Sequence, residues 1–154
     1  WIDFPREGNG WSFKYARRQW SLEEPDYLRY SFLRNFDEAM IHLVKEEDAL
    51  SSPPVLLTAD EQKQILVFMR GNLLFAFNFN PSQSFSDYGF SAPGGKFGMV
   101  LDSDEKRFNG FERVSPRETH IAVECKSPNG NRDFDHTLYL YLPSRCALVL
   151  KLNG

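Results

Sequence analysis

Apolar and polar positions follow two different periods along the chain, and the change falls near residue 51. Before this point apolar residues recur every three or four positions between about Glu24 and Glu47, which predicts an amphipathic helix. The apolar positions of this stripe are Leu28, Phe32, Leu33, Phe36, Ala39, Met40, Leu43 and Val44. Ser21 and Glu24 have the spacing of a capping box at its start. A shorter helix is expected from Ser12 to Trp20, because serine is a favoured helix cap.

Beyond the linker-like cluster Ser51-Ser52-Pro53-Pro54, apolar residues alternate with polar ones over short runs. The runs predict strands at Val55–Ala59, Gln64–Arg70, Leu73–Asn80, Gly98–Asp102, His120–Lys126, Thr137–Leu142 and Ala147–Leu152. Gly71-Asn72 predicts a two-residue hairpin turn, and Pro93-Gly94-Gly95 and Pro128-Asn129-Gly130-Asn131 predict further turns. Short strands joined by turns are typical of an antiparallel β-sandwich. The chain is therefore expected to be mainly β, with a helical part at residues 1–50 and an all-β domain at residues 51–154.

Composition supports a folded domain and narrows its partners. The 154 residues are 42% hydrophobic, 15% aromatic and 25% charged, which is a globular balance with ample material for a core. The net charge of −3 disfavours a protein that binds nucleic acid or a membrane surface by electrostatics. No apolar run approaches the roughly 20 residues of a membrane-spanning helix. We expect neither nucleic acid nor a membrane as a partner.

Cysteine use and the first residue bear on the setting of the chain. Two cysteines, Cys125 and Cys146, do not make a disulfide scaffold or a zinc ribbon, and buried reduced thiols are the expectation. Asn80-Pro81-Ser82 has the proline that forbids N-glycosylation. Both features fit a cytoplasmic protein. The chain starts at Trp1 without a signal-peptide pattern, so we expect it to be a piece of a longer protein.

Sequence motifs for metal binding or nucleophilic catalysis are absent. Asp102, Asp104 and Glu105 cluster after a predicted strand, but Lys106 and Arg107 stand where a calcium loop needs a ligand and a glycine. We therefore expect a solvated loop and no metal. The three histidines, which do not have metal-ligand spacing, are His42, His120 and His136. There is no G-x-S-x-G motif and no glycine-rich phosphate loop.

Large aromatic and arginine side chains gather in the first twenty residues. They are Trp1, Trp11, Phe13, Tyr15, Arg17, Arg18 and Trp20. Aromatic faces stack on sugar rings, and arginine forks hold carboxylates or sugar hydroxyls. The same residues would equally serve to wedge this segment against a neighbouring domain. The residue pattern alone leaves both functions open.

Sequence blocks along nearly the whole chain resemble a known family. They are Trp1–Gly10, Tyr15–Trp20, Leu28–Tyr30, Asn35–Met40, Phe75–Pro81, Ser86–Tyr88, Pro93–Phe97, Val100–Asp104 and Tyr141–Arg145. In this order they closely resemble the carboxy-terminal part of glycogen (starch) branching enzymes of the α-amylase superfamily. The resemblance implies that residues 1–50 are the end of a (β/α)8 catalytic barrel and that the sandwich is the family's carboxy-terminal domain.

The resemblance also implies an activity for the longer protein. Family members are transferases that cut an α-1,4-glucan and rejoin it through an α-1,6 bond, with an Asp nucleophile, a Glu acid/base and a second Asp. These carboxylates lie upstream of the position of Trp1, so the chain is expected to hold no catalytic residue and to be inactive alone. No metal or organic cofactor is implied. The implied partners are α-glucan and the missing barrel.

Candidate site residues follow from the same resemblance. Trp1, Asp3 and Arg6 come after the last barrel strand, where active-site loops gather, and are candidates for lining the glucan cleft. Arg17, Arg18 and Trp20 are candidates for holding this loop to the barrel.

Two other functions remain open. The chain could be a non-catalytic carbohydrate-binding sandwich, or an interaction domain whose helix docks a partner. If the chain is instead the end of a branching enzyme, the helix stripe of Leu28, Phe32, Phe36 and Met40 should bury against barrel elements that this chain lacks. An apolar stripe left exposed favours association, so we expect the helix to repack on its own sandwich or the chain to self-associate.

Overall fold

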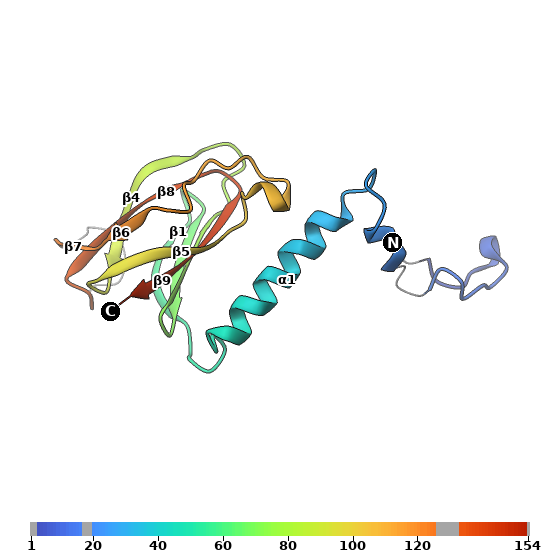
Figure 1. The fold of residues 1–154 in the computed structure, drawn as a ribbon, viewed down its shortest axis with the longest axis horizontal. Helices are drawn as coiled ribbons and strands as arrows, with labels where there is room; N and C mark the ends of the chain where they lie inside the picture. The colour runs from blue at the N-terminus through green and yellow to red at the C-terminus, as the bar shows by residue number, and fades with distance from the viewer. Residues whose placement is uncertain (1–2, 17–19, 126–132, 154) are drawn as a thin grey trace.

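A long helix, α1, precedes the strands in the computed structural model, which describes residues 3–16, 20–125 and 133–153 (Figure 1). The helical elements are η1 (Glu7–Asn9), η2 (Trp20–Glu23), α1 (Tyr30–Glu46) and η3 (Lys106–Phe108). The strands are β1 (Val55–Asp60), β2 (Ile65–Arg70), β3 (Leu73–Asn78), β4 (Phe85–Ala92), β5 (Lys96–Asp102), β6 (Thr119–Ile121), β7 (Val123–Glu124), β8 (His136–Leu142) and β9 (Cys146–Asn153). No helix of the described residues is long and apolar enough to cross a membrane.

The strands form two antiparallel sheets, which confirms the predicted mainly-β fold. Their orders are β1-β2-β3-β9-β5-β6 in the larger sheet and β4-β8-β7 in the smaller one. The predicted hairpin turn at Gly71-Asn72 joins β2 to β3, with Arg70 paired to Leu73. Gly71 has a φ of 54° at the first central position, which glycine adopts without strain and which matches the twist of a hairpin.

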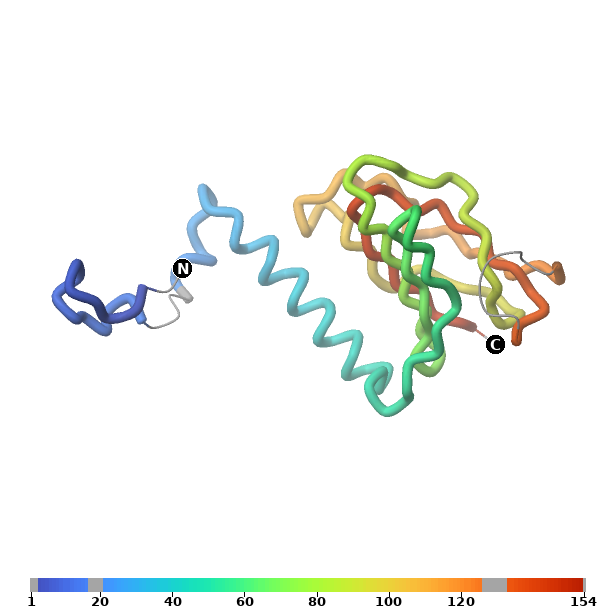
Figure 2. The backbone as a smooth tube through the Cα atoms, turned by 180° about the vertical axis from the view of Figure 1, so that it is seen from behind, coloured from blue at the N-terminus to red at the C-terminus, as the bar shows by residue number. Residues whose placement is uncertain are grey.

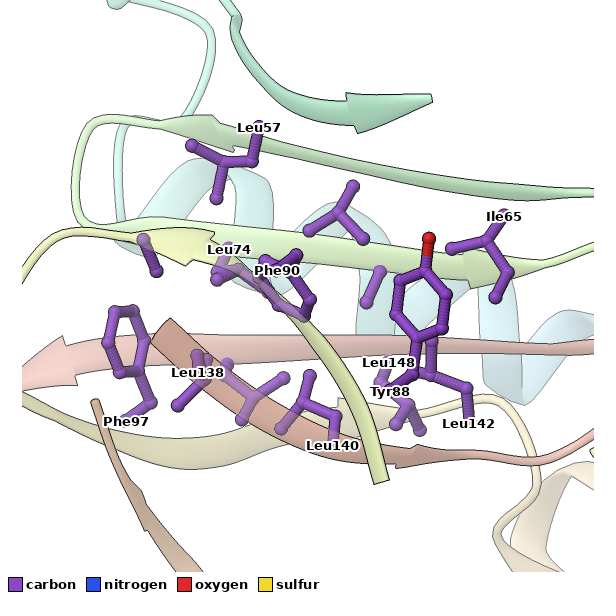
Figure 3. Close-up of a cluster of buried hydrophobic side chains, with 14 of the residues drawn as sticks. Leu57, Ile65, Leu74, Tyr88, Phe90, Phe97, Leu138, Leu140, Leu142 and Leu148 are labelled. Carbon is purple, nitrogen blue, oxygen red and sulfur yellow. The ribbon is translucent and has the colours of Figure 1, made fainter. Parts of the chain in front are cut away.

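The core lies between the two sheets, and the sandwich closes it with its own residues. Alternate residues of β2, β3 and β9 face alternate residues of β4 and β8 across it (Figure 3). Phe90, Phe97 and Leu138 are fully buried there. The buried residues of this cluster all lie between Leu57 and Leu150, so the preceding helix contributes none of them.

The larger sheet also has an apolar outer face, and α1 packs on it. Phe36, Ala39 and Leu43 of α1 contact a second cluster that includes Leu73 of β3 and Val149 of β9. The Phe36 ring meets Phe108 edge-on at 5.3 Å, and Lys151 Nζ donates to Glu47 Oε1 at 2.7 Å. Helix packing on the sandwich is one of the two outcomes expected for the apolar stripe.

The apolar stripe of α1 is wider than the surface the sandwich offers. Leu33, Met40 and Ile41 remain 60%, 40% and 47% exposed. Figure 2 shows that none of the described residues covers α1 on the side away from the sandwich, and that residues 3–16 lie beyond its N-terminal end. This apolar outer face of α1, defined by Leu33, Met40 and Ile41, has no partner among the described residues.

Two predicted helix positions need correction. Helix α1 begins at Tyr30, because residues 26–29 form turns in which the N–H of Leu28 bonds to the carbonyl of Pro25. The expected capping serine, Ser21, lies inside η2 instead. Residues 12–16 of the expected Ser12–Trp20 helix are also irregular, since the Ser12 hydroxyl accepts from the N–H of Lys14 in a local turn. Residues 17–19 lie outside the described residues.

Strand predictions fail at two places for physical reasons. The predicted strand His120–Lys126 divides at Ala122, where the N–H bonds to the carbonyl of Gly95. Strand β6 pairs in the larger sheet and β7 in the smaller one, so the chain changes sheets at this residue. Strand β4 was not predicted, because Ser86, Asp87 and Gly89 break its alternation. The predicted Pro128–Asn131 turn lies outside the described residues.

The loop after β5 is tied down by a buried carboxylate, and the expectation of a solvated loop was wrong. Asp102 and Asp104 are only 3% and 5% exposed. The guanidinium of Arg113 donates to both Asp104 oxygens at 2.8 and 3.0 Å, and the N–H groups of Phe111 and Arg113 donate to them as well. Burial raises the pKa of Asp104, but these hydrogen bonds outweigh it and hold the pKa below its ordinary value.

The two cysteines differ in their surroundings. Cys146 is buried as expected, and burial raises the pKa of its thiol to about 12, so it is unreactive. Cys125 is exposed, which corrects the expectation for that residue, and the two thiols do not form a disulfide with each other.

We predict that Asp104→Asn lowers the free energy of unfolding at pH 7 by about 3 kcal/mol, the low end for breaking a buried pair, since Arg113 is 28% exposed. Because the folded-state pKa of Asp104 is depressed, its stabilisation exists above the ordinary value of 3.8 and disappears as pH falls through the folded pKa. Urea denaturation should therefore show the difference shrinking below pH 3.8.

Asp26→Asn, at an exposed aspartate, is the matched control and should change stability little at either pH. A loss for Asp104→Asn of under about 0.5 kcal/mol at pH 7, the scale of an ordinary surface substitution, would contradict the structural role of this pair.

Candidate functional site

The segment before η2 forms a closed loop. The N–H of Asp3 bonds to the carbonyl of Tyr15 at 3.0 Å, which joins the two ends of the loop. Between them η1 makes a tight turn, and the N–H of Trp11 returns to the carbonyl of Arg6 at 2.9 Å. These bonds give residues 3–15 a defined backbone although the loop has no buried core.

Asp3 and Arg6, two of the predicted cleft residues, form the polar centre of this loop. Arg6 Nε and Nη2 donate to Asp3 Oδ1 and Oδ2 at 3.0 and 3.2 Å, and Asn9 Nδ2 donates to Asp3 Oδ2 at 3.2 Å. The hydrogen bond from Arg6 lowers the pKa of Asp3, and the same bond raises the pKa of Arg6. The pair is therefore fully ionised at neutral pH and presents both donors and acceptors to solvent.

The same loop carries three exposed aromatic rings. Phe4, Trp11 and Phe13 are 70%, 67% and 72% exposed. An ion pair with a fixed arginine fork, set among exposed aromatic rings, can hydrogen-bond sugar hydroxyls and stack on a sugar ring.

The other predicted site residues are not tested by the structure. Trp1, Arg17 and Arg18 lie outside the described residues, and Trp20 is described only as the first residue of η2. Among the described side chains, no three His, Cys, Asp or Glu residues are grouped so that they could hold a metal ion.

Four phenylalanines form a row on the outer face of β2 and β3. Phe68 lies 5.1 Å from Phe75 and 5.9 Å from Phe77, and Phe77 lies 5.5 Å from Phe79, with interplanar angles of 16°, 19° and 3°. Nearly parallel rings this close overlap face to face with an offset rather than lie in one plane. The four rings therefore form a continuous apolar ridge on this face.

A separate hollow of about 300 Å³ lies beside β8 and was missed from sequence. Its lining includes Tyr139 and Tyr141 of β8. These two side chains point away from the core of the sandwich, whereas the alternating residues Leu138, Leu140 and Leu142 point into the core. The signal was present, because alternation along this strand places aromatic residues rather than charged ones on the outward positions.

The class of the domain follows from the fold and from a family match. Residues 57–153 match the family described as the alpha amylase, C-terminal all-beta domain. The matched region is the two-sheet sandwich, so the chain belongs to this family.

Similarity extends beyond the sandwich to the helical part. The chain is 46% identical over 154 residues to the 1,4-alpha-glucan-branching enzyme of Dictyostelium discoideum, covering 98% of the chain and 22% of that protein. It is 41% identical to the enzyme of the same name from Rhizophagus irregularis and 42% identical to that of Yarrowia lipolytica, each over 97% of the chain. The chain spans about a fifth of the length of these relatives, at 21–22%. The resemblance to branching enzymes is confirmed.

We predict that Asp3 titrates below its ordinary pKa of 3.8 and that Arg6→Ala moves the titration to higher pH, because the largest cause of the lowering is removed. The carboxyl resonance of Asp3, followed by ¹³C NMR against pH, measures this. Arg117→Ala, at an exposed arginine outside the loop, should leave the midpoint unchanged. Equal midpoints in the original chain and Arg6→Ala would show that the pair does not form in solution.

Proposed function

We propose that this chain is the carboxy-terminal part of a 1,4-α-glucan-branching enzyme, divided near residue 51. Residues 1–50 form the end of the catalytic barrel, and residues 51–154 form a sandwich that supports it. The similarity to branching enzymes across the helical part as well as the sandwich carries this proposal.

The activity belongs to the longer protein. It cuts an α-1,4-glucan and transfers the segment to a sugar 6-hydroxyl by a retaining mechanism, with an Asp nucleophile, a Glu acid/base and an assisting Asp in the preceding barrel. No metal or cofactor takes part. The contacts of Asp104 support the placement of the catalytic carboxylates outside this chain. Both oxygens of Asp104 accept hydrogen bonds from Arg113, so this buried carboxylate cannot act on a substrate.

The loop of residues 3–15 contributes to binding in the glucan cleft. The Asp3–Arg6 pair offers acceptors and donors to sugar hydroxyls, and Trp1, an aromatic residue of the same segment of the sequence, is the third candidate for binding the glucan. Arg17, Arg18 and Trp20 hold the loop against the barrel.

The outer face of α1 is the surface against which the barrel packs. Leu33, Met40 and Ile41 form an apolar strip on a helix that the sandwich covers on one side only. Such a strip favours this arrangement over a stand-alone carbohydrate-binding module, which would leave it in water. The absence of a Cys125–Cys146 disulfide supports a cytoplasmic location for the enzyme.

The test is to incubate the longer protein with amylose and to count α-1,6 linkages in the product by ¹H NMR. We expect new branches, formed at least about tenfold more slowly by Arg6→Ala, because a lost hydrogen bond to a charged group costs roughly 1.5–3 kcal/mol. Arg117→Ala should branch at the original rate. Shortened linear chains without α-1,6 linkages would overturn the proposed activity, and an unchanged rate in Arg6→Ala would overturn the role of the loop.

A further inference from the structure

The hollow is lined by Tyr139, Leu140 and Tyr141 of β8. This strand belongs to the smaller sheet, which lies on the side of the sandwich away from α1 (Figure 1). Strand β7 pairs with β8 only at His136 and Thr137, so residues 138–142 have no strand beside this edge among the described residues. The segment from Arg113 to His120 passes along the gap, and Leu140 and Leu148 of the core form its base. The hollow is thus a break in the sandwich wall, away from the surface where we place the barrel.

Tyr139 forms a flat wall of this hollow. It pairs with Gly89 of β4, and a Cβ at Gly89 would lie 2.6, 3.0 and 3.3 Å from Cε1, Cδ1 and Cζ of the tyrosine ring. The ring therefore lies across the glycine backbone, where any other residue would displace it. Tyr139 is nevertheless 46% exposed. The face of the ring turned away from Gly89 is therefore available for a ligand.

Polar groups with unused hydrogen-bonding capacity converge on the same hollow. Asp87 of β4 and Glu118, which precedes β6, both contribute to its lining. Nε2 of His120 is buried without a hydrogen-bond partner, which no other buried side-chain nitrogen or oxygen shows in the part of the chain that the structure describes. Burial lowers the pKa of His120, despite the nearby charge of Glu118, so the ring is neutral at neutral pH. A buried nitrogen of this kind calls for a ligand hydroxyl or a water.

The charges of the lining select the class of ligand. Arg113, the cation of the lining, is already neutralised by its bidentate contact with Asp104 and also bonds to Ser144. The two carboxylates, Asp87 and Glu118, repel phosphates and carboxylates. A neutral polyhydroxyl ligand with an apolar ring face fits a flat aromatic wall, several acceptors and a volume at the low end of small-ligand sites (about 300–1,000 Å³).

We propose that this hollow binds one or two glucose units of an α-1,4-glucan chain, with Tyr139 stacking on a sugar ring and Asp87, Glu118 and His120 accepting from its hydroxyls. That the sugar is an α-glucan rests on the proposed function, whereas the sugar-binding chemistry rests on the hollow itself. The site holds a glucan chain at a distance from the catalytic cleft.

The experiment is a titration of the 154-residue chain with maltoheptaose. Isothermal calorimetry measures the affinity, and ¹H–¹⁵N NMR shows which residues respond. We expect saturable binding with shifts centred on β8 and on residues 118–120. Tyr139→Ala should weaken binding at least tenfold, and Tyr139→Phe, which keeps the ring, should remain within about threefold, a difference of under 1 kcal/mol. Phe79→Ala removes an exposed ring from the other sheet and should change nothing. Circular dichroism checks that each variant is folded.

Three outcomes would overturn the inference: no saturable binding to the folded chain, equal affinity in Tyr139→Ala, or equal affinity for cellohexaose, which has β-1,4 links. Binding that fails while the longer protein still branches amylose would overturn this site alone. A longer protein that makes no branches although the chain binds maltoheptaose would overturn the proposed function alone.

Discussion

The larger sheet must bury both of its faces, and the other features of the molecule depend on this constraint. Along β9, Leu148 and Leu150 point into the sandwich core, while Val149 between them points outward and is 5% exposed. A strand buried on both sides needs a cover on each side. The smaller sheet is one cover and α1 is the other, which is why the helix and the sandwich form one structure although their sequences are unlike.

The same constraint explains why the surfaces of the chain differ in character. Helix α1 packs one side of its apolar stripe on the sheet, and a second apolar side, centred on Leu33 and Met40, is left uncovered by the described residues. The loop before it, with no core, is held by hydrogen bonds around Asp3. The smaller sheet is too narrow to close its side of the sandwich completely, and the hollow beside Tyr139 lies where its edge ends.

Sequence reasoning located what periodicity determines and missed what depends on distant neighbours. Alternation along β2, β3 and β9 and the stripe of α1 were sufficient to predict a helix and a sandwich. Strand β4 was not predicted because its polar residues and Gly89 do not alternate with apolar ones. The reason for Gly89 is its pairing with Tyr139, which lies 50 positions away in the sequence. Asp104 was expected in solvent because its partner, Arg113, reaches it across a loop with no repeating pattern. The site residues Asp3 and Arg6 came from family resemblance, and spacing alone did not indicate their pairing.

The claim that the apolar outer face of α1 is covered by the rest of the protein can be tested directly by cysteine labelling. In a Cys125→Ser background, where Cys146 is buried, Met40→Cys should react with maleimide at least tenfold more slowly in the longer protein than in the 154-residue chain. Arg117→Cys, at an exposed position outside this helix, should react at the same rate in both. Equal rates for Met40→Cys in the two proteins would mean that this face stays in water and that the account of α1 is wrong.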